Sequence, residues 1–375
     1  MSGSRSEAPV VVLLGGTSAE HDVSVRSGTA IVDALRAAGR RAQPVLIDLD
    51  GGWWWLPADH VRAGRPPSAY DEPAALGAAG PFSAGVAAGI IAAIAPPPVA
   101  FIALHGPAGE DGTVQGMLEV AGIAYAGSGV AASAIGMDKT LFKRLAETAG
   151  LPVVPWVAIR DTTWRADPAR VLADLDALAA AAGSPRLIAK PARLGSSIGM
   201  AIAHEVGERA AALETAFAHD SLAIVEHCLD HPRELEVSVV GNDPATTVAF
   251  GPGEVRPGHE FYDYAAKYLT DDARTLPTTD LPGATAAEVR RLALAAYALI
   301  GAEGFARVDF LVDGDRVYVS EVNTIPGFTE ISLFPQVCAA AGMPMPALCT
   351  RIVTLAEERH AARRATHVRP GDLPR

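Results

Sequence analysis

Short apolar runs alternate with helix-like segments through residues 9 to 134. Buried strands are predicted by three of the runs, "PVVVLLGG", "RAQPVLIDLD" and "PVAFIALHG". Helices are predicted by "EHDVSVRSGTAIVDALRAAG" and "GTVQGMLEVAG". This alternation predicts an open, mostly parallel sheet with helices on both faces. Residues 51 to 98 interrupt it with an Ala-, Gly- and Pro-rich insertion, which we expect at the surface with Trp53 to Trp55 packed against it.

Two further units follow along the chain. From about Met137 the pattern predicts the helices "DKTLFKRLAETAG" and "PARVLADLDALAAAAG" and the strands "VVPWVAI", "RLIAKP" and "LAIVEHCL". From about Arg233 it predicts the strand "ELEVSVVG", a polar segment from 252 to 281, the helix "TAAEVRRLALAAYALIG" and a final hairpin. We therefore expect an α/β fold with an N-terminal domain at 1–136, a central domain at 137–232 and an α+β C-terminal domain at 233–375.

The second strand of that hairpin, "RVYVSEVN", ends in polar residues where more valines would be expected. Side chains alternate along a strand, so Val317, Val319, Glu321 and Asn323 are expected to share one face. Glu321 and Asn323 would then sit side by side. The plain alternative is a solvated end of the hairpin.

The first strand of the hairpin adds a second carboxylate. If residues 313 to 315 form the turn, Arg307 is expected opposite Glu321, with Asp309 one diagonal step away, about 7–8 Å between Cα atoms. Two carboxylates and the Asn323 amide oxygen would form an oxygen-only site, which suits Mg²⁺ that also holds waters and substrate phosphates.

Composition excludes several classes of function. The 375 residues carry a net charge of −12, and a nucleic-acid or anionic-membrane partner would need clustered positive charge instead. Three widely spaced cysteines predict neither a disulfide framework nor a zinc site, and favour a reducing compartment such as the cytoplasm. The apolar run after Glu7 ends in Gly15 and Gly16, which favours a buried strand over a signal peptide.

A candidate phosphate-binding loop lies in "AKPARLGSSIGM". The chain has no G-x-x-x-x-G-K-[ST] sequence, and no G-x-G-x-x-G follows its first strand. Instead Lys190 ends a strand, and Gly195 and Gly199 would allow backbone N–H groups and the hydroxyls of Ser196 and Ser197 to approach an anion. A simple turn is the alternative.

Six separated motifs together resemble the D-alanine–D-alanine ligases of the ATP-grasp superfamily. They are "LLGGTSAEHDVSVRSG", "LHGPAGEDGTVQGMLE", "MDK", "KPARLGSSIGM", "EFYDYAAKYL" and "RVDF" with "SEVNTIPGFTEISLFP". The resemblance runs in order from about residue 9 to 357. It implies an ATP-grasp fold with ATP between the central and C-terminal domains, and ATP-dependent joining of two D-alanines through an acyl phosphate for peptidoglycan precursors. It also implies Mg²⁺ or Mn²⁺, two ions, and a cytoplasmic homodimer.

Carried over by position, the resemblance assigns a role to each residue of the site. The implied metal ligands are Asp309, Glu321 and Asn323. The implied ATP contacts are Lys139, Lys190, Ser197 and Lys267 at the phosphates, Glu226 and Leu229 at the adenine, and Glu234 at the ribose. The implied D-alanine contacts are Glu20 and His105 for the first molecule, and Tyr262, Ser332 and Leu333 for the second. Arg307 and the N–H of Gly327 would form the oxyanion hole, and Ser196 and Tyr268 would join Glu20 to hold a lid loop closed.

Other interpretations stay open at this point. His105 could be a structural histidine at a strand end, Glu20 could serve only as a helix cap, and Lys139 could be a surface charge. The same fold could use D-lactate, D-serine or another amino acid as acceptor, or could bind nucleotide without turnover. The uncharged Tyr268 after Lys267 favours D-alanine over D-lactate at neutral pH.

Overall fold

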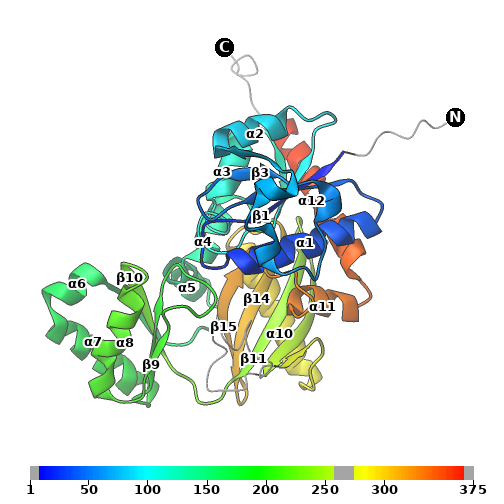
Figure 1. Cartoon of the computed structure of the whole chain (residues 1–375). Helices are drawn as coiled ribbons and strands as arrows, with labels where there is room; N and C mark the ends of the chain where they lie inside the picture. Colours follow the sequence, from blue (N-terminus) through cyan, green and yellow to red (C-terminus); the bar gives the residue numbers. More distant parts are fainter. Residues whose placement is uncertain (1–7, 257–273, 367–375) are drawn as a thin grey trace, which may run out of the picture.

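The computed structural model describes residues 8 to 256 and 274 to 366. Within this part of the chain the strands form three sheets, of six, four and five strands, with helices packed against them (Figure 1). Strands from residues 10 to 126 form the first sheet, strands from 156 to 227 the second, and strands from 233 to 323 the third. Each sheet falls inside one of the three expected domain ranges.

The N-terminal sheet is mostly parallel, as the alternation predicts. Its strands are β1 (Val10–Gly15), β2 (Ala42–Ile47), β3 (Trp53–Trp55), β4 (Ala79–Phe82), β5 (Val99–Ile102) and β6 (Ala124–Ala126). In the spatial order β4-β3-β2-β1-β5-β6, β1 pairs in parallel with β2 and β5, and β5 pairs in parallel with β6. Every residue of β1 is buried, which explains its unbroken apolar sequence.

The insertion at residues 51 to 98 does not stay at the surface. It supplies β3 and β4, which extend the sheet edge in antiparallel fashion, and it buries Val61, Tyr70 and Ile91. These few large side chains are enough to anchor a segment whose Ala, Gly and Pro content suggests a surface loop. Trp55 meets Phe82 edge to face with ring centroids 5.5 Å apart, so the expected packing of the tryptophans is confirmed.

Helices cover both faces of this sheet. They are α1 (His21–Ala37), α2 (Ala84–Ala92), α3 (Thr113–Val120) and, from the C-terminal end, α12 (Met345–Ala365), whereas α4 (Val130–Met137) buries Ala132 in the core of the C-terminal sheet. One face of β1 packs with α1 and α12, and the other with α2 and α3. Arg359 of α12 donates a hydrogen bond to the carbonyl of Tyr125 at 2.7 Å. The C-terminal helix therefore returns to the N-terminal sheet.

The central sheet is antiparallel, in the order β7-β10-β8-β9. Its strands are β7 (Trp156–Arg160), β8 (Leu187–Pro191), β9 (Ala201–Ala203) and β10 (Leu222–His227), and its helices are α6 (Asp161–Ala166), α7 (Pro168–Ala182) and α8 (Arg209–Phe217). Helix α5 (Lys139–Thr148) comes before them and buries Phe142 and Ala146 in the core of the C-terminal sheet. Helix α7 begins where the Asp167 side chain accepts a hydrogen bond from the N–H of Arg170, and it ends at Gly183 with φ of 71°. The loop between β8 and β9 contains the candidate phosphate-binding segment.

The C-terminal sheet is also antiparallel, in the order β13-β12-β11-β14-β15. Its strands are β11 (Arg233–Gly241), β12 (Val248–Arg256), β13 (Arg274–Leu276), β14 (Gly304–Asp313) and β15 (Arg316–Asn323), and its helices are α10 (Gly283–Leu299) and α11 (Leu333–Ala340). Helix α10 buries Val289 and Leu292 against Val237 and Val308. One face of the sheet is thus closed by an apolar core, and its polar side chains point the other way.

The register of the final hairpin differs from the expected one. Asp309 pairs with Glu321, and Arg307 with Asn323, so the expectation of Arg307 opposite Glu321 is wrong. The turn between the paired Asp313 and Arg316 has two residues, and a register shift beside Asp309 leaves one extra residue in β15.

That shift also changes which side chains share a face. Val319 and Val322 are both buried in the α10 core, although two residues lie between them. The expectation that Val319 shares a face with Glu321 is therefore wrong, because the extra residue reverses the alternation. Glu321 and Asn323 remain together, and Asp309 now lies directly across from Glu321.

Among the described residues no single helix is both long and apolar enough to cross a membrane. Helices α11 and α12 pass that test only as a pair, by length and composition, and they meet at an angle of 104°. Both helices contribute side chains to the core under β1.

Candidate active site

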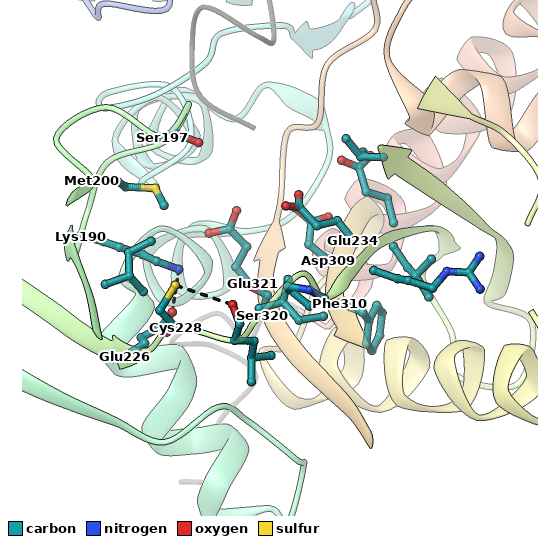
Figure 2. Close-up of a pocket in the computed structure, with 18 of the residues that line it drawn as sticks. Lys190, Ser197, Met200, Glu226, Cys228, Glu234, Asp309, Phe310, Ser320 and Glu321 are labelled. Carbon is teal, nitrogen blue, oxygen red and sulfur yellow. Dashed lines mark hydrogen bonds and ion pairs between the residues drawn. The ribbon is translucent and has the colours of Figure 1, made fainter. Parts of the chain in front are cut away.

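A cavity of about 470 Å³ lies between the central and C-terminal sheets (Figure 2). This volume falls in the range of cofactor and small-molecule sites. Its lining includes every described residue that the resemblance assigns to ATP: Lys139, Lys190, Ser197, Glu226, Leu229 and Glu234. Asp309 and Glu321 line the same cavity from β14 and β15.

The hairpin carboxylates are held by cations. Asp309 accepts from Arg307 Nε at 2.7 Å and Nη2 at 2.6 Å, and from Asn323 Nδ2 at 2.9 Å. Glu321 Oε2 lies 3.1 Å from Lys139 Nζ. The three predicted metal ligands are therefore together, at the edge of a cavity that also contains the predicted phosphate contacts.

The chemistry of this set suits a hard divalent cation. Asp309 and Glu321 are half-buried carboxylates on neighbouring strands, and Asn323 offers an amide oxygen beside them. In the described part of the chain no group of three or more His, Cys, Asp or Glu residues gathers as a metal site. Two carboxylates and an amide bind Mg²⁺ only with help from waters or phosphates, which the adjoining cavity could supply.

A buried ion triad forms the floor on the central side. Glu226 is 3% exposed, and its two oxygens contact Lys143 Nζ and, at 2.6 Å, Lys190 Nζ. Burial alone would raise the pKa of Glu226, but the two ammonium groups outweigh it and lower that pKa to about 2. Glu226 in turn outweighs burial at Lys190 and raises its pKa, so Lys190 is a fixed positive charge at the cavity.

The loop after β8 reaches the N-terminal domain. Ser196 and Ser197 have φ values of 53° and 58°, a left-handed conformation that turns successive backbone N–H groups toward one side. Ser196 Oγ donates a hydrogen bond to Glu20 Oε1. A Cβ added at Gly195 would lie 3.1 Å from Glu20 Oε2, so the loop backbone passes close to that carboxylate.

A second cavity, of about 100 Å³, adjoins the first. Six residues line both: Gly195, Ser196, Glu236, Val255, Arg307 and Glu321. The remaining lining includes the predicted D-alanine contacts Glu20, His105, Ser332 and Leu333, together with Asn323 and Gly327. The two cavities therefore meet at Arg307 and Glu321.

The second cavity has a negative wall at Glu20. This carboxylate is 6% exposed, and within the described ranges its Oε2 has no hydrogen-bond partner. Glu20 precedes helix α1 but makes no side-chain cap hydrogen bond, so helix capping does not explain it. A buried carboxylate oxygen without a donor is a natural partner for a substrate ammonium group.

His105 is fully satisfied within the protein. Its Nδ1 lies 3.1 Å from the carbonyl of Ile325 and its Nε2 lies 3.0 Å from Ser27 Oγ. Burial lowers the pKa of His105, so the ring is neutral at pH 7. Its proton is on Nδ1, which donates a hydrogen bond to the Ile325 carbonyl. Both ring nitrogens of His105 therefore have partners within the protein, as expected of a structural histidine, and the ring lines the second cavity.

The opposite wall is formed by the turn before α11. A Cβ added at Gly327 would lie 2.6 Å from Ser332 Oγ, so a side chain at this position would force the Ser332 hydroxyl to move. Ser332 Oγ accepts a hydrogen bond from the Thr329 N–H at 3.1 Å. The predicted contacts Tyr262, Lys267 and Tyr268, and the centre of the predicted lid, lie outside the described residues.

Three site residues are absent from the sequence-based prediction. Lys143 follows Lys139 by one helical turn in α5, a spacing that could have revealed it. Glu236 alternates with Glu234 along β11 and so shares its face. Glu110 lines the second cavity and accepts from the Gly106 N–H at 2.7 Å, and burial beside Glu20 raises its pKa well above the usual range.

The fold and site define a class of enzyme. Two α/β units that enclose a nucleotide-sized cavity between antiparallel sheets, with lysines on one side and hairpin carboxylates on the other, form an ATP-grasp fold. The family model described as "D-ala D-ala ligase N-terminus" matches residues 9–128, and that described as "D-ala D-ala ligase C-terminus" matches residues 145–354. The chain belongs to the D-alanine–D-alanine ligase family.

Individual relatives agree with this assignment. The chain is similar to the D-alanine–D-alanine ligase of Chlorobaculum tepidum, with 39% identity over 95% of this chain and 98% of the relative. Among solved structures, the D-alanine-D-alanine ligase from Coxiella burnetii superposes with a TM-score of 0.76 at 28% identity, covering 96% of this chain and 98% of that one. The VanG D-Ala:D-Ser ligase from Enterococcus faecalis also gives 0.76, at 25% identity, covering 93% and 99%.

Proposed function

We propose that the chain joins two D-alanine molecules in an ATP-dependent reaction to give D-alanyl-D-alanine for peptidoglycan precursors. One observation carries the proposal: the small cavity with Glu20 adjoins the nucleotide-sized cavity, and Arg307 and Glu321 line both. An amino acid bound by its ammonium group at Glu20 could present its carboxylate at that opening. A phosphate bound beside Lys139 and Lys190 would meet it there.

The residues then divide the chemistry between them. A carboxylate is a poor acylating agent, so the carboxylate of the first D-alanine would attack the γ-phosphate of ATP, which breaks the bond to the β-phosphate and gives an acyl phosphate and ADP. Lys139 and Lys190 would balance the phosphate charge. The ion held by Asp309, Glu321 and Asn323 would neutralise charge on the transferred group.

The second D-alanine would enter beside Ser332 and Leu333. Its amine would attack the acyl carbonyl, and Arg307 with the N–H of Gly327 would stabilise the tetrahedral oxyanion. Phosphate would leave from the same carbon. Ser196, bonded to Glu20, would hold the loop that separates the acyl phosphate from water.

The family membership and the intact set of charged residues support an enzyme over a nucleotide-gated binding protein. Purified chain with ATP and Mg²⁺ should release phosphate only when D-alanine is supplied, and the product should have the mass of the dipeptide. Phosphate release at the same rate with and without D-alanine would contradict the proposal. Binding of ATP without formation of the dipeptide would also contradict it.

The acceptor, the location and the assembly are finer parts of the proposal. The VanG ligase among the similar structures is named for D-serine, so an acceptor panel should include D-alanine, D-serine and D-lactate. The three cysteines, Cys228, Cys338 and Cys349, are free thiols, which supports the cytoplasm as location. The homodimer that the resemblance implies stays a prediction.

A further inference from the structure

Three carboxylates stand in register across the C-terminal sheet. Glu236 on β11 pairs with Asp309 on β14, and Asp309 pairs with Glu321 on β15. Direct neighbours in antiparallel strands point to the same side of the sheet. Asp309 and Glu321 are predicted metal ligands, whereas Glu236 has no assigned role.

Glu236 contacts the same arginine as Asp309, at the same nitrogen atom. Its Oε2 lies 3.3 Å from Arg307 Nε, and both side chains are largely shielded from solvent, at 13% and 20% exposed. Arg307 therefore has two carboxylate partners, Asp309 in a two-point contact and Glu236 in a single one. Glu236, Arg307 and Glu321 also lie where the two cavities meet.

The two partners differ in what a metal ion would do to them. Asp309 uses both oxygens to hold Arg307, so a cation that binds Asp309 competes with the guanidinium group for those oxygens. The same cation would repel the guanidinium group. Glu236 is then the remaining negative charge that can keep Arg307 at the opening between the cavities.

We propose that Glu236 is a positioning residue for Arg307, which holds the guanidinium group at the acyl carbonyl once the metal ion engages Asp309. The inference rests on the proposed roles of Arg307 and Asp309. In this arrangement Glu236 touches neither the ion nor the substrates. Its effect reaches the reaction only through the orientation of Arg307.

The test is a double-mutant cycle of Glu236→Gln and Arg307→Lys, measured as kcat and KM for D-alanine and ATP. Glu236→Gln alone should lower kcat about tenfold or more while KM for ATP stays within about threefold, because supporting residues of this kind typically contribute 10–100-fold. In the Arg307→Lys background the same substitution should cost less than about threefold, because the fork of the guanidinium group is already lost.

Binding of Mn²⁺ to the ADP complex, followed by electron paramagnetic resonance, separates positioning from ligation. The dissociation constant for Mn²⁺ should change less than about threefold in Glu236→Gln. An increase above about tenfold, with kcat restored at saturating Mn²⁺, would make Glu236 a metal ligand and overturn the proposal. Equal losses in both backgrounds, or an unchanged kcat, would also overturn it.

A matched control is Glu303→Gln, which breaks a half-buried ion pair with Arg363 at 3.0 Å, just before β14 and outside both cavities. It should alter thermal stability without altering kcat. If Glu236→Gln does not fold, Glu236→Asp can replace it, because it keeps the charge on a shorter side chain. We then expect a smaller loss of kcat, again with little change in the KM for ATP and in the dissociation constant for Mn²⁺. Full activity of Arg307→Lys would instead refute the proposed role of Arg307, which is a separate failure.

Discussion

Ser196 donates a hydrogen bond to Glu20, which lies 176 residues earlier in the chain. The bond joins the candidate phosphate-binding loop of the central sheet to the residue before helix α1 of the N-terminal sheet. Because Glu20 Oε1 is engaged in this way, the other oxygen, Oε2, is the one without a partner in the described ranges. A direct hydrogen bond therefore links the loop to the carboxylate that we propose binds the substrate ammonium group.

Ser196→Ala should weaken binding of the first D-alanine. A hydrogen bond to a charged group is worth about 1.5–3 kcal/mol, so we expect KM for D-alanine to rise roughly tenfold or more, with KM for ATP changed much less. Initial rates of ADP release across D-alanine concentrations measure both constants. Ser83→Ala, at an exposed serine before α2, is the control and should behave as the parent enzyme. An unaltered KM for D-alanine in Ser196→Ala would show that the bond does not orient Glu20.

Glu321→Gln should abolish turnover while the fold survives. The substitution keeps the shape of the side chain but removes one of two negative charges from the predicted metal site, so kcat should fall by about 100-fold or more. The melting temperature should change little, because Glu321 is partly exposed and its pair with Lys139 is a weak source of stability. Glu358→Gln, which removes an exposed pair with Arg351, is the matched control. Normal activity of Glu321→Gln at physiological Mg²⁺ would show that Glu321 is not a required metal ligand.

The order of strands and helices could be predicted from the sequence because local patterns carry it. Runs such as that of β1 are buried on both faces and therefore continuously apolar, and the helices begin and end at residues such as Asp167 and Gly183. The surface placement of residues 51 to 98 failed because burial of a few isolated side chains, Tyr70 among them, leaves no periodic trace.

The hairpin register shows a different kind of limit. The position of a β-bulge depends on how the strands pair in the folded sheet, and no residue type in "RVYVSEVN" predicts it. The buried ion triad of Glu226 with Lys143 and Lys190 depends on a helix packing over a sheet, so its members are not neighbours in any local pattern. Site residues that a family motif contains could be found early, whereas the contacts of residues that support them, such as that of Lys143 with Glu226, required the structure.

Glu226 should make stability depend on pH in the acid range. Its pKa is about 2 in the folded protein against an ordinary value of 4.5. The depressed pKa means that the charged triad stabilises the fold above pH 4.5, and that this contribution is lost as the pH falls from 4.5 toward 2. At pH 7 the difference corresponds to about 3 kcal/mol.

Glu226→Gln tests this prediction through urea unfolding at pH 7 and near pH 3. We expect the variant to be less stable than the parent by about 3 kcal/mol at pH 7, and the difference to shrink by about half near pH 3. Glu214→Gln, which removes an exposed carboxylate paired with Arg165, controls for general acid effects. A stability difference that does not depend on pH would mean that Glu226 acts by packing rather than by charge.

The identity of the acceptor is expected to follow the charge of the lid residue at position 268. An amine must lose its proton before it attacks, whereas D-lactate presents a hydroxyl and carries a negative charge without an ammonium group to balance it. On the family resemblance, ligases that make the ester tend to lack this tyrosine and have a histidine in the lid, whose positive charge favours the lactate anion. Tyr268 is uncharged at neutral pH and would supply no such attraction.

The wild-type enzyme, given equal D-alanine and D-lactate near pH 7, should therefore yield mainly D-alanyl-D-alanine, with the ester a minor product even at lower pH. Mass spectrometry of the products across pH 5.5–8, an interval in which a histidine would titrate, measures the partition directly. Tyr268→His should raise the ester share as the pH falls, because protonation adds a positive charge beside the acceptor. Tyr268→Phe, which adds no charge, should loosen the preference without that pH dependence. A wild-type enzyme that forms mostly the ester at pH 7 would show that the acceptor is selected by groups other than Tyr268.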